Sequence, residues 1–156
     1  MTQYIVEYTD TVRPEWIDSN GHMNLAYYVV VFDLGTDRLY DALRIGNAYR
    51  EATGNSCFTA ETHTLYEREV LVGEKLRVAT TLLGVDAKRL HYFHEMFHAT
   101  EGHRVAAQEL LALHIDMGLR RVAPFPPDRL AVIEAALRAQ GDRPPPPGVG
   151  RTIKSL

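Results

Sequence analysis

Four strand-like runs follow one another in the second half of the chain, and they constrain its fold more than any other feature. They are rich in β-branched and aromatic residues, and short turns such as Asp86-Ala87-Lys88-Arg89 and Glu101-Gly102 separate them. The Ala and Leu content of the last run would also suit a helix. The runs predict one antiparallel sheet, built from residues 56–69, 75–85, 90–100 and 103–116.

A long helix is predicted before these runs. From Leu25 the apolar residues recur at helical spacing, and Asn24 can cap the helix by accepting a bond from a free amide. Gly46 is a suitable stop. Gly35 and Thr36 fall on the apolar side, where small residues would let another backbone come close. That apolar side consists of Leu25, Val29, Phe32, Leu39 and Leu43.

The two ends of the chain complete an α+β order. Residues 3–13 predict a first strand, which Pro14 ends, and a C-terminal helix is predicted up to about Gln140. The Pro-rich stretch beyond it cannot pack as regular structure. We therefore expect one domain over residues 1–140 and a flexible tail over residues 141–156. Because one sheet packed on one helix leaves its edge strands exposed, a homodimer or homotetramer is expected.

The composition argues against several classes of protein. A chain of 156 residues, 46% hydrophobic and 24% charged, is ordinary for one globular domain. A net charge of -3 argues against non-specific nucleic-acid binding. Cys57 is the one cysteine, the N-terminal residues do not resemble a signal peptide, and no apolar run approaches the ~20 residues that cross a bilayer. We expect a cytoplasmic protein without a nucleic-acid or membrane partner.

The run His94-Glu95-Met96-Phe97-His98 matches the H-E-x-x-H pattern of zinc peptidases. That pattern binds one metal ion only on a helix, where residues four apart are neighbours. On a strand, His94 and His98 would lie about 13 Å apart, too far for a single ion. The short, aromatic-rich run favours a strand, so a zinc peptidase is a minor alternative and no metal site is expected.

The segment Asp18-Ser19-Asn20-Gly21-His22-Met23-Asn24 is the strongest candidate for chemistry. A carboxylate before a helix can attack an acyl carbon or activate a water molecule. The helix start offers free amides and the positive end of the dipole to an oxyanion. An aspartate near a glycine also commonly bonds its own backbone in a turn, so both roles are open for Asp18 on the residues alone.

Together with the order of elements, the segment from Trp16 to Asn24 resembles the hotdog-fold thioesterases of the 4-hydroxybenzoyl-CoA type. The resemblance covers roughly residues 3–120. Within that family the chain is most similar to a subgroup linked to carnitine breakdown, whose members hydrolyse betainyl-CoA. The residues that carry the closer similarity are Pro14-Glu15-Trp16-Ile17-Asp18, Gly21-His22-Met23-Asn24, Asp86-Ala87-Lys88-Arg89-Leu90 and Ala123-Pro124-Phe125-Pro126-Pro127.

This resemblance implies an α+β hotdog fold, in which a five-stranded antiparallel sheet wraps the long helix and a C-terminal helix follows. It also implies hydrolysis of a small acyl-CoA, with Asp18 as nucleophile or general base. His22 and Asn24 are further catalytic candidates, although His22 could only position the loop and Asn24 could only cap the helix. No metal or organic cofactor is implied beyond CoA as part of the substrate.

The substrate-binding candidates are less specific. Trp16 could contact a trimethylammonium group through its ring. Glu61 and His63, two apart on a strand, share a face and could bind a water molecule, or could form the polar face of an edge strand. Lys88 and Arg89 could bind CoA phosphates or could be ordinary surface charges. The complete set is Trp16, Asn20, Gly21, Tyr27, Glu61, His63, Lys88 and Arg89.

A hotdog protein that binds an acyl thioester or another small ligand without turnover is the main alternative. The residues alone do not separate it from an enzyme, because both need the same fold and the same ligand pocket.

Overall fold

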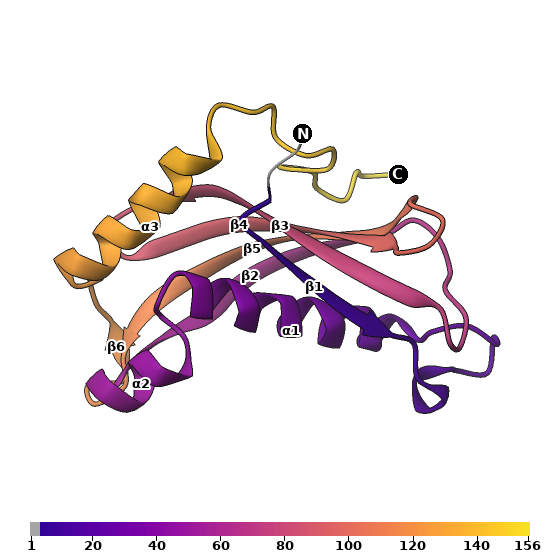
Figure 1. Ribbon diagram of the computed structural model, residues 1–156, viewed down its shortest axis with the longest axis horizontal. Helices are drawn as coiled ribbons and strands as arrows, with labels where there is room; N and C mark the ends of the chain where they lie inside the picture. Colours follow the sequence, from indigo (N-terminus) through magenta and orange to yellow (C-terminus); the bar gives the residue numbers. More distant parts are fainter. Residues whose placement is uncertain (1–3) are drawn as a thin grey trace.

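A six-stranded antiparallel sheet dominates the computed structural model, which describes residues 4–156 (Figure 1). The main path of the sheet has the order β1-β3-β4-β5-β2, and the short β6 pairs with the end of β5. All four predicted runs are confirmed as strands, including the Ala- and Leu-rich one. The strands are β1 (Val6–Thr11), β2 (Asn55–Tyr66), β3 (Lys75–Val85), β4 (Arg89–His98), β5 (Arg104–Asp116) and β6 (Arg121–Val122).

The first strand, β1, is shorter than predicted. It begins at Val6 rather than at residue 3, and Gln3 lies outside the described residues. Strand β1 pairs with β3 from Val6 opposite Thr80 to Thr11 opposite Lys75, and it forms one edge of the sheet. Strand β2 forms the opposite edge.

The long helix α1 (Leu25–Ala42) packs on one face of the curled sheet (Figure 1). Asn24 caps its start, and both Gly35 and Thr36 are buried, as predicted. A Cβ atom at Gly35 would lie 3.0 Å from Cγ1 of Val78, so the small residue lets the helix approach β3 closely. The helix ends at Ala42, a few residues before the predicted stop at Gly46.

Two apolar clusters make up the core, and α1 contributes side chains to both. One is centred on Phe32 and the other on Leu39, both fully buried side chains of the helix. The first cluster also contains Trp16, Met23 and Val70. The core therefore anchors the segment around Asp18 as well as the helix that follows it.

The start of α1 departs from the predicted apolar side. Phe32, Leu39 and Leu43 are buried as expected, but Leu25 is 62% exposed and Val29 40% exposed. Both residues have the right helical spacing, but no element of the described chain covers the helix at these positions. Periodicity predicts a face of the helix and not how far its partner extends along it.

Three short elements were not predicted. Pro14 begins a 3-10 turn, η1 (Pro14–Trp16), instead of only ending the strand before it. A short helix, α2 (Asn47–Thr53), fills the connection between α1 and β2 and ends at Gly54, whose φ is 71°. The two-residue β6 is the third.

Helix α3 (Pro127–Gln140) and the C-terminal residues lie over the opposite face of the sheet from α1 (Figure 1). The predicted C-terminal helix is confirmed. Its last residue, Gln140, uses its side-chain amide to bond both N–H and C=O of Leu82 at 2.9 Å. Residues 141–156 contain no helix or strand. The domain boundary and the flexibility of this tail stay predictions.

Within residues 4–156, no helix has both the length and the apolar character that a membrane crossing requires.

Candidate active site

Asp18 begins a tight turn that is closed by backbone hydrogen bonds within the turn. Its N–H donates to the carbonyl of His22 at 3.1 Å, and the N–H of Gly21 donates to the carbonyl of Asp18 at 3.0 Å. Gly21 has a φ of 82°, in the left-handed region that favours glycine. A β-bridge between Ile17 and Met23 closes the base of the turn.

Two hydrogen bonds fix the Asp18 carboxylate. Oδ1 accepts from the backbone N–H of Asn20 at 2.8 Å, and Oδ2 accepts from the side-chain amide of Asn24 at 3.2 Å. The Asn20 amide, with smaller effects from Asn24 and His22, holds the pKa of Asp18 below its usual range. The carboxylate is therefore ionised at neutral pH, the form that a nucleophile or a general base requires.

Asn24 connects this carboxylate to the start of α1. While its Nδ2 donates to Asp18, its Oδ1 accepts from the backbone N–H of Ala26 at 3.0 Å. The N–H of Tyr27 donates to the carbonyl of Asn24. In the first turn this leaves the N–H of Leu25 without a hydrogen-bond acceptor among residues 4–156. A free amide of this kind, beside a carboxylate and at the positive end of the helix, can stabilise an oxyanion.

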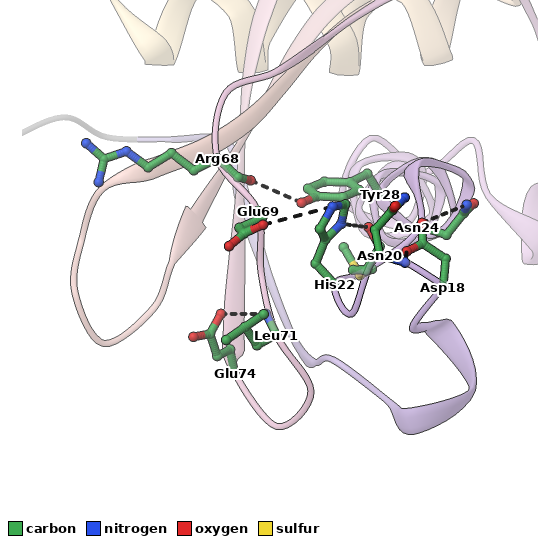
Figure 2. Close-up of polar contacts among 10 residues, drawn as sticks. Asp18, Asn20, His22, Asn24, Tyr28, Arg68, Glu69, Leu71 and Glu74 are labelled. Carbon is green, nitrogen blue, oxygen red and sulfur yellow. Dashed lines mark hydrogen bonds and ion pairs between the residues drawn. The ribbon is translucent and has the colours of Figure 1, made fainter.

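The turn and the helix start rest on the segment that follows β2, residues 67–70 (Figure 2). The N–H of Met23 donates to the carbonyl of Val70 at 2.9 Å, and the Tyr28 hydroxyl donates to the carbonyl of Arg68 at 3.1 Å. His22 Nε2 lies 3.9 Å from a carboxylate oxygen of Glu69. Sequence reasoning did not find this support, because the contacts join residues 40 or more positions apart with no local pattern.

Trp16 does not have the exposed ring that a substrate contact needs. Its side chain is 5% exposed, it stacks on Tyr27 with ring centroids 5.6 Å apart, and the Arg13 guanidinium lies 4.7 Å from the indole centroid. The contact of Trp16 with a trimethylammonium group stays a prediction, and this burial does not favour it. Trp16 instead holds the loop: its carbonyl accepts from the N–H of Asn24, and Tyr27 is half-buried against it.

Glu61 and His63 do not join Asp18 within one chain. His63 lies opposite Glu109 in the β2–β5 register, and the Glu109 carboxylate bonds His91 at 2.7 Å and the N–H of Gly150 at 2.6 Å. These contacts lie on the face of the sheet that carries the tail, opposite α1. Within one chain the pair is therefore on the other face of the sheet from α1, because strand alternation directs both side chains there, and a role of the pair in the site stays a prediction.

Lys88 and Arg89 lie at the far end of the sheet from Asp18. Arg89 is opposite Leu113 on β5, whereas Tyr66, whose hydroxyl bonds the carbonyl of Leu25, is opposite Ala106. Seven residues of strand separate the two positions on β5, or about 23 Å. Arg89 also pairs with Asp86 at 2.6 Å. Within one chain this turn does not reach Asp18.

The H-E-x-x-H motif lies on strand β4, as predicted. His94 is fully buried between two hydroxyls, at 2.9 Å from Thr36 Oγ1 and 2.8 Å from Thr80 Oγ1. His98 Nδ1 accepts from the N–H of Glu101 at 3.0 Å. Across residues 4–156, no group of three or more His, Cys, Asp or Glu side chains is arranged to hold a metal ion.

The model of the thioesterase-like superfamily matches residues 12–136, which include the turn, the long helix and every strand of the sheet except β1. The chain belongs to this superfamily. A betainyl-CoA thioesterase from Pseudomonas aeruginosa is 40% identical over 153 residues, which cover 98% of this chain and 96% of that protein. An L-carnitine dehydrogenase/betainyl-CoA thioesterase from Agrobacterium fabrum is 36% identical over 145 residues, 93% of this chain but only 29% of that longer protein.

Solved structures share the fold. A Staphylococcus aureus protein in complex with CoA superposes with a TM-score of 0.90 and 28% identity, covering 100% of this chain and 98% of that chain. A 1,4-dihydroxy-2-naphthoyl-CoA thioesterase from Synechocystis superposes with a TM-score of 0.72 and 15% identity, covering 85% and 94%. The predicted hotdog fold is confirmed, and the turn at Asp18 lies at the start of its central helix.

Proposed function

We propose that this thioesterase-superfamily chain hydrolyses betainyl-CoA to the free acid and CoA. The observation that carries the substrate is the 40% identity to the Pseudomonas aeruginosa betainyl-CoA thioesterase, because it extends over nearly the full length of both chains. The fixed, ionised Asp18 beside the start of α1 supports the chemistry.

The reaction replaces the C–S bond of the thioester by a C–O bond. Asp18 either attacks the carbonyl carbon and forms a mixed anhydride, which water then cleaves, or takes a proton from the attacking water. In both routes the carbonyl oxygen becomes an oxyanion, which the Leu25 N–H and the α1 dipole would stabilise. The CoA thiolate leaves and takes up a proton.

We also propose that the active form is a homo-oligomer joined along β2. Strand β2 is a 12-residue edge strand, and its Phe58 and Tyr66 are exposed apolar side chains. Leu25 and Val29 of α1 are exposed as well, and Leu25 is bonded to Tyr66. A second copy that pairs with this edge would cover backbone groups and apolar side chains that are otherwise open to water.

An antiparallel partner along β2 would also give Lys88 and Arg89 a role. The Asn55 end of β2 in the second copy would lie beside the Tyr66 end of β2 in the first. The Lys88–Arg89 turn is at the same end of the sheet as Asn55, so the turn of one copy would lie near the Asp18 end of the other. Lys88 is the better candidate for a CoA phosphate, because Asp86 already pairs with Arg89. A cytoplasmic location stays a prediction.

The deciding experiment measures thiol release from a panel of acyl-CoA substrates that includes betainyl-CoA, acetyl-CoA and a medium-chain acyl-CoA. We expect the highest kcat/KM for betainyl-CoA, and a loss of about 100- to 10,000-fold in Asp18→Asn. Hydrolysis that is absent from the whole panel, or that is undiminished in Asp18→Asn, would contradict the proposal. Absence in the wild type would favour a ligand-binding protein without turnover.

A further inference from the structure

Arg104, the first residue of β5, makes four side-chain hydrogen bonds, and two of them hold the segment 67–70 through Glu67. Its Nε and Nη2 donate to the two carboxylate oxygens of Glu67 at 2.9 and 2.6 Å. Its Nη1 donates to Glu95 at 3.0 Å and to the carbonyl of Pro147 at 2.7 Å. The Arg104 side chain is only 15% exposed, so water screens this network less than it screens a surface ion pair.

The backbone next to Arg104 also binds the segment 67–70. The carbonyl of Val105 accepts from the N–H groups of both Glu67 and Arg68, at 2.9 and 3.1 Å. Two successive amides that share one carbonyl mark the point where the chain leaves β2 and turns away from β5. The direction that residues 67–70 take is therefore set at Arg104 and Val105.

The other side of this segment carries the candidate active site. The carbonyl of Arg68 accepts from the Tyr28 hydroxyl, and Glu69 faces His22 (Figure 2). The carbonyl of Val70 accepts from the N–H of Met23. Val70 and Met23 are 0% and 1% exposed, so neither can move without disturbing the core. Met23 forms the base of the Asp18 turn through its bridge to Ile17.

We infer that Arg104 is a positioning residue for the Asp18 turn, acting through Glu67 and the segment 67–70. This inference rests on the proposed hydrolase function. Arg104 fixes the side of the segment that faces the sheet, and Met23 and Tyr28 transmit that position to Asp18 and to the helix start. Arg104 touches none of the reacting groups, and its effect on turnover is entirely geometric.

The chemistry of the contact requires arginine. The planar guanidinium matches the two oxygens of Glu67 and still has Nη1 for Glu95 and Pro147. A lysine ammonium is a single point donor and cannot keep the paired bonds to Glu67 while also reaching Glu95. The Glu95 side chain is 11% exposed and the Glu67 side chain 33% exposed, so a neutral residue at position 104 would leave two carboxylates to repel each other without a cation between them.

The test compares Arg104→Lys, Arg104→Gln and Glu67→Gln with Arg77→Gln. Arg77 is the matched control, because it forms an ion pair of 2.6 Å with Glu7 on the same sheet, and its guanidinium lies over the ring of Phe97 and not against residues 67–70. Glu67→Gln leaves the Arg104–Glu95 pair in place, so it tests the path even if a variant at position 104 unfolds. Thermal unfolding identifies any variant that is not folded at the assay temperature.

Two readouts are needed on each folded variant. We expect kcat for the preferred acyl-CoA to fall roughly 10- to 100-fold in the Arg104 and Glu67 variants, with KM changed by about twofold or less. We expect faster hydrogen exchange in the peptide that contains Asp18 and Met23. Arg77→Gln is expected to change neither, even if it lowers the melting temperature.

The inference is overturned if folded Arg104 and Glu67 variants keep wild-type kcat, or if exchange around Asp18 is unchanged while kcat falls. It is also overturned if Arg77→Gln produces the same changes as the Arg104 variants. Failure of the proposed function can be distinguished from failure of this inference. It would appear as hydrolysis that is absent in the wild type or undiminished in Asp18→Asn. Exchange around Asp18 reports the coupling even when no substrate is turned over.

Discussion

The side-chain amide of Asn24 donates to Asp18 at 3.2 Å and accepts the Ala26 N–H at 3.0 Å, so one residue joins the carboxylate to the start of α1. The distance and direction between Asp18 and the amides of the first turn are thereby fixed before any substrate binds. Preorganisation of this kind lets a site stabilise developing charge without reorganising during the reaction.

Asn24→Asp separates the two functions of this residue. Aspartate is as good a helix cap as asparagine, so we expect the melting temperature to change little. The new carboxylate cannot donate to Asp18, and two carboxylates that share a site raise the pKa of one of them. We expect kcat to fall by about 10-fold or more and the acid limb of the kcat/KM profile to move to higher pH.

Asn24→Ala is the companion variant, because it removes the cap as well and should cost about 1 kcal/mol of unfolding free energy. A pH profile of Asn24→Asp that coincides with the wild-type profile would show that Asn24 does not tune Asp18.

Leu25→Pro removes the amide proposed to bind the oxyanion. Leu25 is the first helical residue, a position where proline is tolerated, and Asn24 before it has the extended φ of -64° and ψ of 145° that a following proline requires. We expect a helix that still forms and a kcat that falls on the order of 100-fold or more. Circular dichroism and thiol-release kinetics measure the two effects.

Leu25→Ala is the matched control, because it shortens the same exposed side chain but keeps the N–H. Equal activity in the proline and alanine variants would exclude the Leu25 amide as an oxyanion donor.

The fold was largely predictable because its signals are local. Helical spacing from Leu25, the Asn24 cap and the turns between the strand-like runs each lie within a few residues of sequence, and the structure confirms them. Helix α2 was missed because its seven residues contain too little periodicity to distinguish a helix from a loop.

The site was only partly predictable. The turn and cap around Asp18 follow from neighbouring residues, but the support from Arg68 and Val70 depends on contacts across the fold. Trp16 was assigned to the substrate from its closeness in sequence to Asp18, which gives no information on which way a ring points or what covers it. Glu61 and His63 were placed beside Asp18 on similar grounds, because alternation predicts that they share a face but not which face it is.

His94 should make the stability of the protein depend on pH. Complete burial lowers the pKa of His94 to about 3, from an ordinary value of 6.5. The unfolded chain therefore binds a proton at this residue between these values while the folded chain does not, so stability falls as the pH drops from 6.5 toward 3. We expect a loss of about 2 kcal/mol between pH 6.5 and 5 from this residue.

Urea unfolding of the wild type and of His94→Gln at several pH values measures this effect. Glutamine can still bond Thr36 or Thr80 but does not titrate, so the variant should lose less stability than the wild type over the same range. Parallel curves for the two proteins would show that His94 titrates normally.

Gly148→Val tests whether the C-terminal tail is held on the sheet. Gly148 has a φ of 106°, and a Cβ atom there would lie 2.9 Å from Cδ1 of Leu65, so valine is strained and meets a side chain of β2. The displaced tail would lose the bonds from Gly150 to Glu109 and from Arg104 to Pro147. We expect fast hydrogen exchange at Gly150 in the variant, slower exchange there in the wild type, and a change of about 1 kcal/mol or less in global stability. Equally fast exchange in both proteins would mean that the tail is flexible, as its proline content predicts, and that Arg104 holds the segment 67–70 without it.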